Sequence, residues 1–407
     1  MNTDVATTGT IKGAWGDYLA RIKSGDMGAL PGVLGLVALC IVFGIMSDVF
    51  LTPGNFANLL AQAASVTVIA MGLVFVLLLG EIDLSAGYAS GVCGAVLVIL
   101  ITNHGAPWWI ALIVSILVGA LLGYTIGTLV SRLGIPSFVV TLAAFLMFQG
   151  LLLLLAGEGG TIRIEDPTIL AVQNNNLSPT LSWILFIAVS AIYVLIGLAK
   201  INSRRKAGLK SELKKLWAIK TGLLLALGAG AVYALNLERS NNPDLVSLKG
   251  TPYIVPVILV LLVAGTFVLG RTAYGRHIYA VGGNAEAARR AGINVKNIRT
   301  SAFVICSSFA AIAGMLFASR QNSISPTTGG SSTLLYAVGA AVIGGTSLFG
   351  GKGKMRDAVL GGLVVAVIDN GMGLLGYAAG VKFIVTGAVL LISAGVDAIS
   401  RRGASSN

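Results

Sequence analysis

The chain has 407 residues, of which 56% are hydrophobic and 11% are charged, and its formal net charge is +12. Soluble domains average about 45–50% apolar and about 25% charged residues, so this composition excludes an ordinary soluble domain and indicates a membrane protein. The positive charge is typical of basic loops kept on the cytoplasmic side of a membrane. Because no stacking platform or basic stripe accompanies it, we expect no nucleic acid among the partners.

Long apolar runs follow one another along almost the whole chain. A membrane helix needs about 20 apolar residues, and the composition therefore predicts an all-α, polytopic membrane helix bundle with about ten to twelve transmembrane helices. The short or glycine-rich runs are candidates for broken or re-entrant helices. The twelve candidate spans are approximately 31–51, 57–79, 85–102, 108–131, 138–156, 180–199, 218–236, 252–270, 300–319, 334–350, 357–376 and 381–399.

The positions of the basic residues predict the topology. With the N-terminus inside and every run crossing, all but five of the 28 Lys and Arg lie in inside segments. The positive-inside rule therefore favours a multi-pass protein of the inner (plasma) membrane with both termini cytoplasmic. Residues 1–30 are expected to form an N-terminal tail without a cleavable signal, and 401–407 a C-terminal tail.

Polar residues in the first half of the chain are few. Asp83 or Ser85, in a Glu-Ile-Asp-Leu-Ser stretch between two runs, is expected to cap the following helix. Ser85 is favoured, and a gating or network role stays open for Asp83. Gln62 and Gln149 lie within the second and fifth runs and are candidates for polar contacts inside the bundle or along a pathway.

Two further features of this half concern packing and surroundings. Gly119, Gly123 and Gly127 form small-xxx-small steps that predict the close approach of another helix. The basic loop 200–220 is interpreted as a topology anchor that contacts anionic lipid headgroups, with partner binding as the alternative.

A polar segment, 271–299, lies between two apolar runs and predicts a short helix. Asn284 is a favourable N-cap, and Gly292 suits the left-handed conformation that ends a helix. Glu286 falls in the first turn and two arginines in the last, as the helix dipole prefers. About two turns of helix are not stable alone in water, so this helix is expected to dock on something.

Two stretches near the C-terminus contain residues of types that can carry chemistry. The glycine-rich stretch 344–354 fails the phosphate-loop spacing and is interpreted as a helix-to-helix turn, so this chain is not expected to bind ATP. Asp369 and Asn370 fall inside an apolar run, and an intramembrane carboxylate is a functional-site hypothesis, here for a pathway or gate. The chain shows no nucleophile beside a base and no metal-ligand spacing, so neither an enzyme nor a metal site is expected.

Five ordered stretches resemble the permease subunits of bacterial ABC importers for monosaccharides of the ribose, xylose and galactose type. They are EIDLSAGYASG, GIPSFVVTLAAF, GRTAYGRHIYAVGGNAEAARRAGINV, AAVIGGTSLFGGKG and IDNGMGLLG. The resemblance implies a transmembrane permease domain over 31–400 and a two-helix insertion over 180–250. A similar extension in xylose-type permeases makes xylose, or a related sugar, the expected substrate. Tyr336 stands where the family often has an aspartate, and it joins the pathway candidates.

The same resemblance implies partners. Segment 271–299 is similar to the family's cytoplasmic coupling loop, whose helix docks on a separate ABC ATPase subunit that holds ATP and magnesium. No cofactor is therefore expected on this chain. Further implied partners are an extracytoplasmic sugar-binding protein, a second copy of the permease (a homodimer) and membrane lipid. The residues carried over to ATPase coupling are Asn284, Glu286, Ala287, Arg289, Arg290 and Gly292.

The expected function is coupling of ATP hydrolysis on the ATPase subunit to monosaccharide import. Another pentose or hexose, or a furanose-like signal sugar, stays open as substrate. The alternative is an ion-coupled secondary transporter of small polar solutes, which predicts several buried carboxylates and an internal repeat. Asp369 is the one carboxylate that the sequence places clearly inside a run, and no strong repeat is visible.

Overall fold

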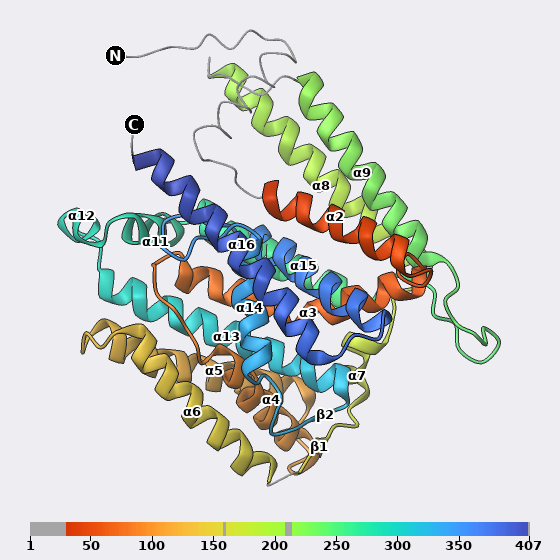
Figure 1. Cartoon of the computed structure of the whole chain (residues 1–407), viewed down its shortest axis with the longest axis horizontal. Helices are drawn as coiled ribbons and strands as arrows, with labels where there is room; N and C mark the ends of the chain where they lie inside the picture. The colour runs from red at the N-terminus through yellow and green to blue at the C-terminus, as the bar shows by residue number, and fades with distance from the viewer. Residues whose placement is uncertain (1–29, 158–159, 208–213, 406–407) are drawn as a thin grey trace. The chain divides into compact units, whose positions relative to one another are not determined.

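The computed structural model of the chain describes residues 30–157, 160–207 and 214–405. The predicted tail 1–30 lies outside the described residues except for its last residue. The helices are α2 (Leu30–Met46), α3 (Pro53–Leu77), α4 (Ala86–Thr102), α5 (Trp108–Ser131), α6 (Ser137–Ala156), α7 (Pro167–Asn174), α8 (Pro179–Lys206), α9 (Lys214–Asn236), α10 (Ile254–Arg271), α11 (Ala273–Gly283), α12 (Ala285–Arg290), α13 (Val295–Gln321), α14 (Ser331–Ile343), α15 (Met355–Leu374) and α16 (Ala379–Ser405) (Figure 1).

The all-α class is confirmed. Among the described residues, strands are limited to β1 (Ile162–Arg163) and β2 (Ser323–Ile324), which pair antiparallel with Ile162 opposite Ile324. β1 and α7 lie in the long connection between α6 and α8. The Asp166 carboxylate begins α7 by accepting from the amides of Thr168 and Ile169, both at 2.9 Å. This connection therefore has regular structure of its own.

Each predicted span overlaps a helix, although α14 ends at Ile343, before the predicted 350, and α8 extends to Lys206, beyond the predicted 199. Eight helices of the described chain are long and apolar enough to cross a membrane, and the four remaining spans correspond to the shorter apolar helices α2, α4, α14 and the first part of α16. α14 has 13 residues, which at about 1.5 Å per residue fall short of a hydrocarbon core about 30 Å thick. It fits the expected short, broken type of segment. α16 continues to Ser405, so the predicted tail 401–407 is helical over most of its length.

The chain divides into two compact units. The larger one consists of residues 28–175 and 252–397, and the smaller one contains 176–251 and the residues from 398 onward. The segment 180–250 falls within the smaller unit. Its description as an insertion relative to shorter permeases stays a prediction.

Within the larger unit, α13 is the central helix and packs against α3, α4 and α5. The glycines of α5 make one of these contacts possible, because Cβ atoms added at Gly119 and Gly123 would lie 2.6 and 2.3 Å from the carbonyl oxygens of Ser307 and Phe303. A Cβ at Gly127 would lie 2.7 Å from Cα of Thr300. The prediction that these small residues admit another helix is confirmed.

The smaller unit is built on the helical hairpin of α8 and α9. Small residues again permit contact, since Gly197 faces the ring of Trp217 across the hairpin. Most of the apolar surface of both helices is exposed, as for helices that face lipid.

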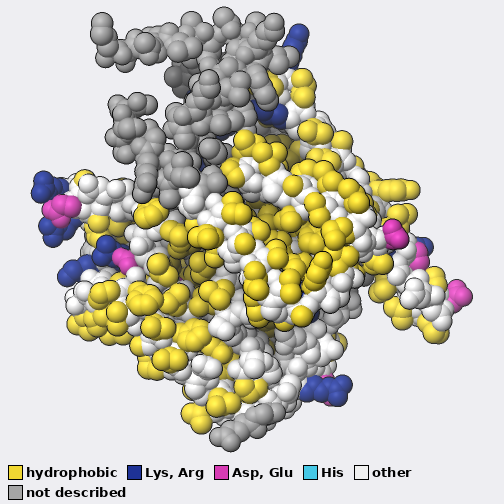
Figure 2. Space-filling model, viewed as in Figure 1, with side chains coloured by type: hydrophobic (Ala, Val, Ile, Leu, Met, Phe, Trp, Pro, Cys, Tyr) yellow, Lys and Arg dark blue, Asp and Glu magenta, His cyan; other side chains and the backbone are white. Residues whose placement is uncertain are grey.

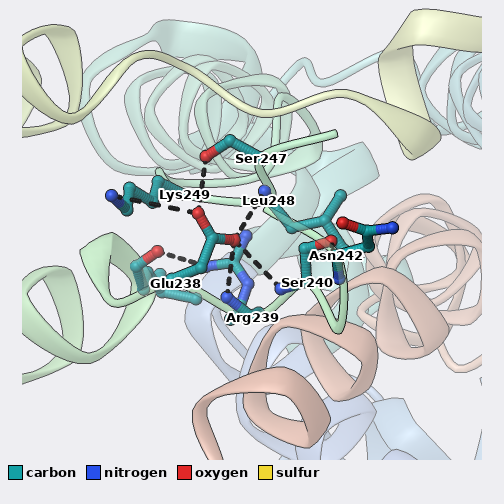
Figure 3. A network of polar contacts seen from close by, with 8 residues as sticks. Glu238, Arg239, Ser240, Asn242, Ser247, Leu248 and Lys249 are labelled. Carbon is teal, nitrogen blue, oxygen red and sulfur yellow. Dashed lines mark hydrogen bonds and ion pairs between the residues drawn. The ribbon is translucent and has the colours of Figure 1, made fainter. Parts of the chain in front are cut away.

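A loop of the smaller unit, 237–251, is held closed by one carboxylate (Figure 3). Glu238 accepts from the amides of Ser240 and Leu248 at 2.9 and 3.0 Å and from the hydroxyl of Ser247 at 2.7 Å. The backbone donation from Leu248, followed by the donations from Ser240 and Ser247, lowers the pKa of Glu238 to about 2. The neighbouring Arg239 guanidinium donates to the carbonyl of Gly250. The side-chain network thus closes a loop that has no regular secondary structure.

Candidate functional site

The polar segment 271–299 forms α11 and α12 at one end of the larger unit (Figure 1). Asn284 caps α12, because its Oδ1 accepts from the amide of Ala287 at 2.9 Å. Gly292 has φ +85°, and the following Ile293 amide donates to the carbonyl of Ala288 at 3.0 Å, which closes the helix end. The predicted cap, helix and terminating glycine are therefore confirmed.

The outward surface of α12 is small and charged. Glu286 pairs with Arg289 at 2.9 Å and with Arg290 at 3.2 Å, and all three side chains are at least half exposed. Figure 2 shows basic and acidic side chains together at the position of α12. Such exposed helical pairs are worth only about 0.3–0.5 kcal/mol, so both arginines are free to exchange Glu286 for a partner's groups.

Ala287 and Ala288, the two small residues in the middle of α12, face different ways. Ala287 is exposed and available to a partner, whereas Ala288 is 4% exposed and packs into the chain itself. The helical period separates them, because neighbouring residues lie about 100° apart around the axis. Of these two alanines, only Ala287 is exposed and can contact another protein.

Two loops, 78–85 and 344–354, contact α11 directly. A Cβ added at Gly282 would lie 1.8 Å from the carbonyl oxygen of Leu78 and 2.9 Å from the amide nitrogen of Gly351. The Gly351 amide itself donates to Leu78 at 2.8 Å. Tyr279 donates its hydroxyl to the carbonyl of Gly353 at 2.7 Å. We call α11, α12 and the loops 78–85 and 344–354 the platform. The sequence composition does not predict that these segments contact one another, although glycines at positions 282 and 351 indicate a close approach of backbone there.

Asp83 and Ser85 lie in this platform. Asp83 is fully buried, and its Oδ1 accepts from the Ser85 amide at 2.9 Å and hydroxyl at 2.6 Å. Burial raises the pKa of Asp83, and the donations from Ser85 oppose the rise. The neighbouring Glu81 carboxylate pairs with Arg299 at 3.2 Å, which fastens the loop to the start of α13.

Ser85 lies at the N-cap position of α4, as favoured, but the prediction that its side chain caps the helix was wrong, because that side chain makes no capping hydrogen bond. Its φ of −86° and ψ of −18° are already helical, and its hydroxyl bonds to Asp83 rather than to a free amide at the start of α4. A capping residue normally has extended backbone. Asp83, two residues earlier, accepts from the Ser85 amide instead and fixes the turn that begins the helix.

The remaining candidates lie toward the other end of the larger unit, where α3 begins and α13 and α15 end (Figure 1). Asn370 is buried and forms a reciprocal amide pair with Asn55, with both hydrogen bonds at 2.9 Å. Asp369 pairs with Lys382 at 3.3 Å, and its side chain is 45% exposed. Asp369 lies inside an apolar run as predicted, but its side chain is only half-buried, on the face of α15 that turns toward the first turn of α16.

Tyr336 belongs to the same region. Its ring lies 6.1 Å from that of Phe383, and its hydroxyl group is near Asp369 and Thr386. Arg320, at the end of α13, interacts electrostatically with Asp369 and donates to Asn58 at 3.4 Å. The structure therefore brings Tyr336 and Asp369 together and adds Arg320 and Lys382, which the sequence did not single out.

The two glutamines differ from these residues. Gln62 is half-buried on α3, and its Oε1 has no hydrogen-bond partner among the residues that the structure describes. Gln149 was expected to make polar contacts inside the bundle, but it is exposed on α6 and does not contribute to the interior of this chain. The apolar length of a run does not show which side of the helix faces inward. Pathway roles for both glutamines stay predictions.

The fold and the two ends together define a multi-pass membrane protein. At one end it carries a short, exposed helix, α12, that belongs to the platform. Residues 55–394 match the family model described as the branched-chain amino acid transport system / permease component. The chain belongs to this permease family.

Individual relatives cover nearly the whole chain. The xylose transport system permease protein XylH of Escherichia coli K12 is 34% identical over 384 residues, 94% of each chain. XylH of Haemophilus influenzae is 32% identical over 383 residues, which are 94% of this chain and 99% of the relative. The ribose import permease protein RbsC of E. coli K12 is 26% identical over 365 residues, 89% and 92% of the two chains. These matches confirm the resemblance to monosaccharide permeases. No solved structure matches the chain.

Proposed function

We propose that this chain is the transmembrane permease subunit of an ATP-driven importer for a monosaccharide, with xylose or a related sugar as substrate. The carrying observation is 34% identity to a xylose permease over 94% of both chains. The family description names a branched-chain amino acid system, but the reported relatives are named for xylose and ribose, and the proposal follows them. The absence of a phosphate-loop spacing favours a permease that performs no bond chemistry.

The proposed partner at the platform is a separate ABC ATPase subunit, which holds the ATP and magnesium. Exposed Ala287 permits close approach, and Arg289 and Arg290 offer exchangeable charges beside it. Asn284 and Gly292 set the length and direction of α12. This orientation makes the platform and both termini cytoplasmic, in agreement with the distribution of Lys and Arg.

The supports of α11 suggest how motion is transmitted. Gly282 lies in close backbone contact with Leu78, and the Tyr279 hydroxyl donates to the loop that precedes α15. A displacement of α12 would therefore move the α3–α4 and α14–α15 connections together. Rigid-body switching of packed helices is an established means of converting such a shift into a change of access. A second permease copy would complete the pathway, and a sugar-binding protein would deliver substrate to the outer face.

Reconstitution tests the proposal. The permease, its cognate ATPase and the binding protein in liposomes should accumulate D-xylose with ATP and no ion gradient. A catalytically inactive ATPase serves as the control. Uptake driven by a sodium or proton gradient without ATP would establish the alternative, an ion-coupled secondary transporter.

A further inference from the structure

The ion pair between Asp369 and Lys382 lies where a charge is costly. Asp369 belongs to a candidate membrane span, and yet its side chain is 45% exposed on the surface of this chain. An ionised group inside a membrane faces water, a protein partner or the bundle interior, because lipid does not solvate it. The exposed side of Asp369 therefore faces water or a protein partner rather than hydrocarbon.

Helix stability does not explain the position of Lys382. It lies in the first turn of α16, and no acidic residue accompanies it there. The helix dipole disfavours a cation at this end. Local rules that are broken in this way are expected mainly at functional positions. Its charge is balanced by Asp369 on the preceding helix, at 3.3 Å.

The groups around this pair supply complementary chemistry. Asp369 is a hydrogen-bond acceptor, and the guanidinium of Arg320 is a donor steadied by Asn58 at 3.4 Å. Tyr336 presents a half-buried ring that is tilted against the ring of Phe383. A neutral sugar needs acceptors and donors for its hydroxyl groups and an apolar, flat surface for its C–H groups. This cluster offers all three, from α13, α14, α15 and α16.

We propose that Asp369, Arg320 and Tyr336 form a sugar-contacting site at the extracytoplasmic end of the pathway, with Lys382 occupying the Asp369 carboxylate until sugar replaces it. This inference rests on the proposed function and names the residues that meet the substrate. In it, Asp369 binds a sugar hydroxyl and Lys382 is a positioning residue. Transport then exchanges one partner of the carboxylate for another, so the carboxylate is never left without one.

The test compares Asp369→Asn with Lys382→Met in the complete reconstituted complex, with xylose-loaded binding protein in excess. D-xylose uptake and ATP hydrolysis are measured together. Asp369→Asn should lower uptake about tenfold or more, since a hydrogen bond to a charged group is lost, while hydrolysis stimulated by the binding protein persists. Lys382→Met should lower uptake by about threefold, less than Asp369→Asn does, because the carboxylate loses the side chain that positions it while the sugar can still reach it.

Glu165→Gln is the matched control. It makes the same carboxylate-to-amide change in an exposed ion pair with Arg163, at 3.8 Å, and should leave both rates unchanged. Normal uptake by Asp369→Asn would overturn the site, as would equal losses of uptake and hydrolysis in both variants, which would make the pair purely structural. Failure of the proposed function is distinguishable, because the unaltered complex would then show no ATP-driven xylose uptake.

Discussion

The two ends of the larger unit are held together by different kinds of contact. At the platform, the tightest contacts join backbone to backbone, since Gly282 lies against the carbonyl of Leu78 and Gly351 donates to the same carbonyl. The side chains of Tyr279 and Glu81 add to these contacts. At the other end, side chains reach across helices, as in the Asn55–Asn370 and Asp369–Lys382 pairs. Backbone contacts permit little adjustment, whereas side chains can exchange partners. A rigid end suits the transmission of force, and an adaptable end suits passage of a ligand.

The largest expected effect comes from filling the backbone contact. Gly282→Ala places a Cβ 1.8 Å from a carbonyl oxygen, so main chain must move. We expect a loss of about 1–3 kcal/mol in the free energy of unfolding, together with weaker ATPase association. Thermal unfolding in detergent and co-purification with the ATPase measure both.

Gly283→Ala is the neighbouring control. No described atom lies within 4 Å of a Cβ added there, and neither glycine has a positive φ. Alanine should be neutral or stabilising by up to about 1 kcal/mol through helix propensity. Equal behaviour of the two variants would contradict the rigid platform.

The charge of α12 should affect docking without affecting the fold. Arg289→Glu with Arg290→Glu reverses the sign of its net charge and removes both ion pairs to Glu286. Because those pairs are weak and exposed, unfolding should change by less than about 1 kcal/mol. ATPase association should weaken about tenfold through like-charge repulsion, as measured by titration of the ATPase onto the reconstituted permease.

Glu286→Gln is the comparison for that double variant, because it removes the same ion pairs but keeps both arginines, so association should weaken less than in the double variant. Assembly and transport at normal levels by the double glutamate variant would exclude α12 as the docking element.

The smallest expected effect is the pH response of a third, side-chain-held region, the loop 237–251. The pKa of Glu238 is lowered to about 2, so its stabilisation is complete above its ordinary pKa and is lost as the pH falls toward 2. An acid-active protease should cleave within 240–247 more readily near pH 2 than at pH 5. Glu238→Gln should be cleaved readily at both values.

Asp244→Asn, in the same loop, should leave that pH dependence unchanged. A wild-type loop that is cut equally at both pH values would show that Glu238 does not hold it closed.

Local patterns predicted local structure well. Each of the twelve apolar runs overlaps a helix, and Asn284 and Gly292 begin and end α12 as their chemistry requires. These features depend on residues within a few positions of each other. The side-chain cap predicted for Ser85 was also a local feature, but it was wrong. The Ser85 hydroxyl donates to Asp83, and the backbone of Ser85 has helical angles that the sequence does not show.

The sequence by itself determined that this is an all-α membrane protein, where its helices lie and to which permease family it belongs, because apolar length, capping and ordered motifs are written along the chain. Tertiary structure alone decided that Gly282 meets Leu78, that Lys382 meets Asp369 and that Gln149 faces outward. In an almost uniformly apolar helix, hydrophobicity does not distinguish the inner face from the outer one. Only packing against residues distant in sequence assigns each polar side chain its neighbours.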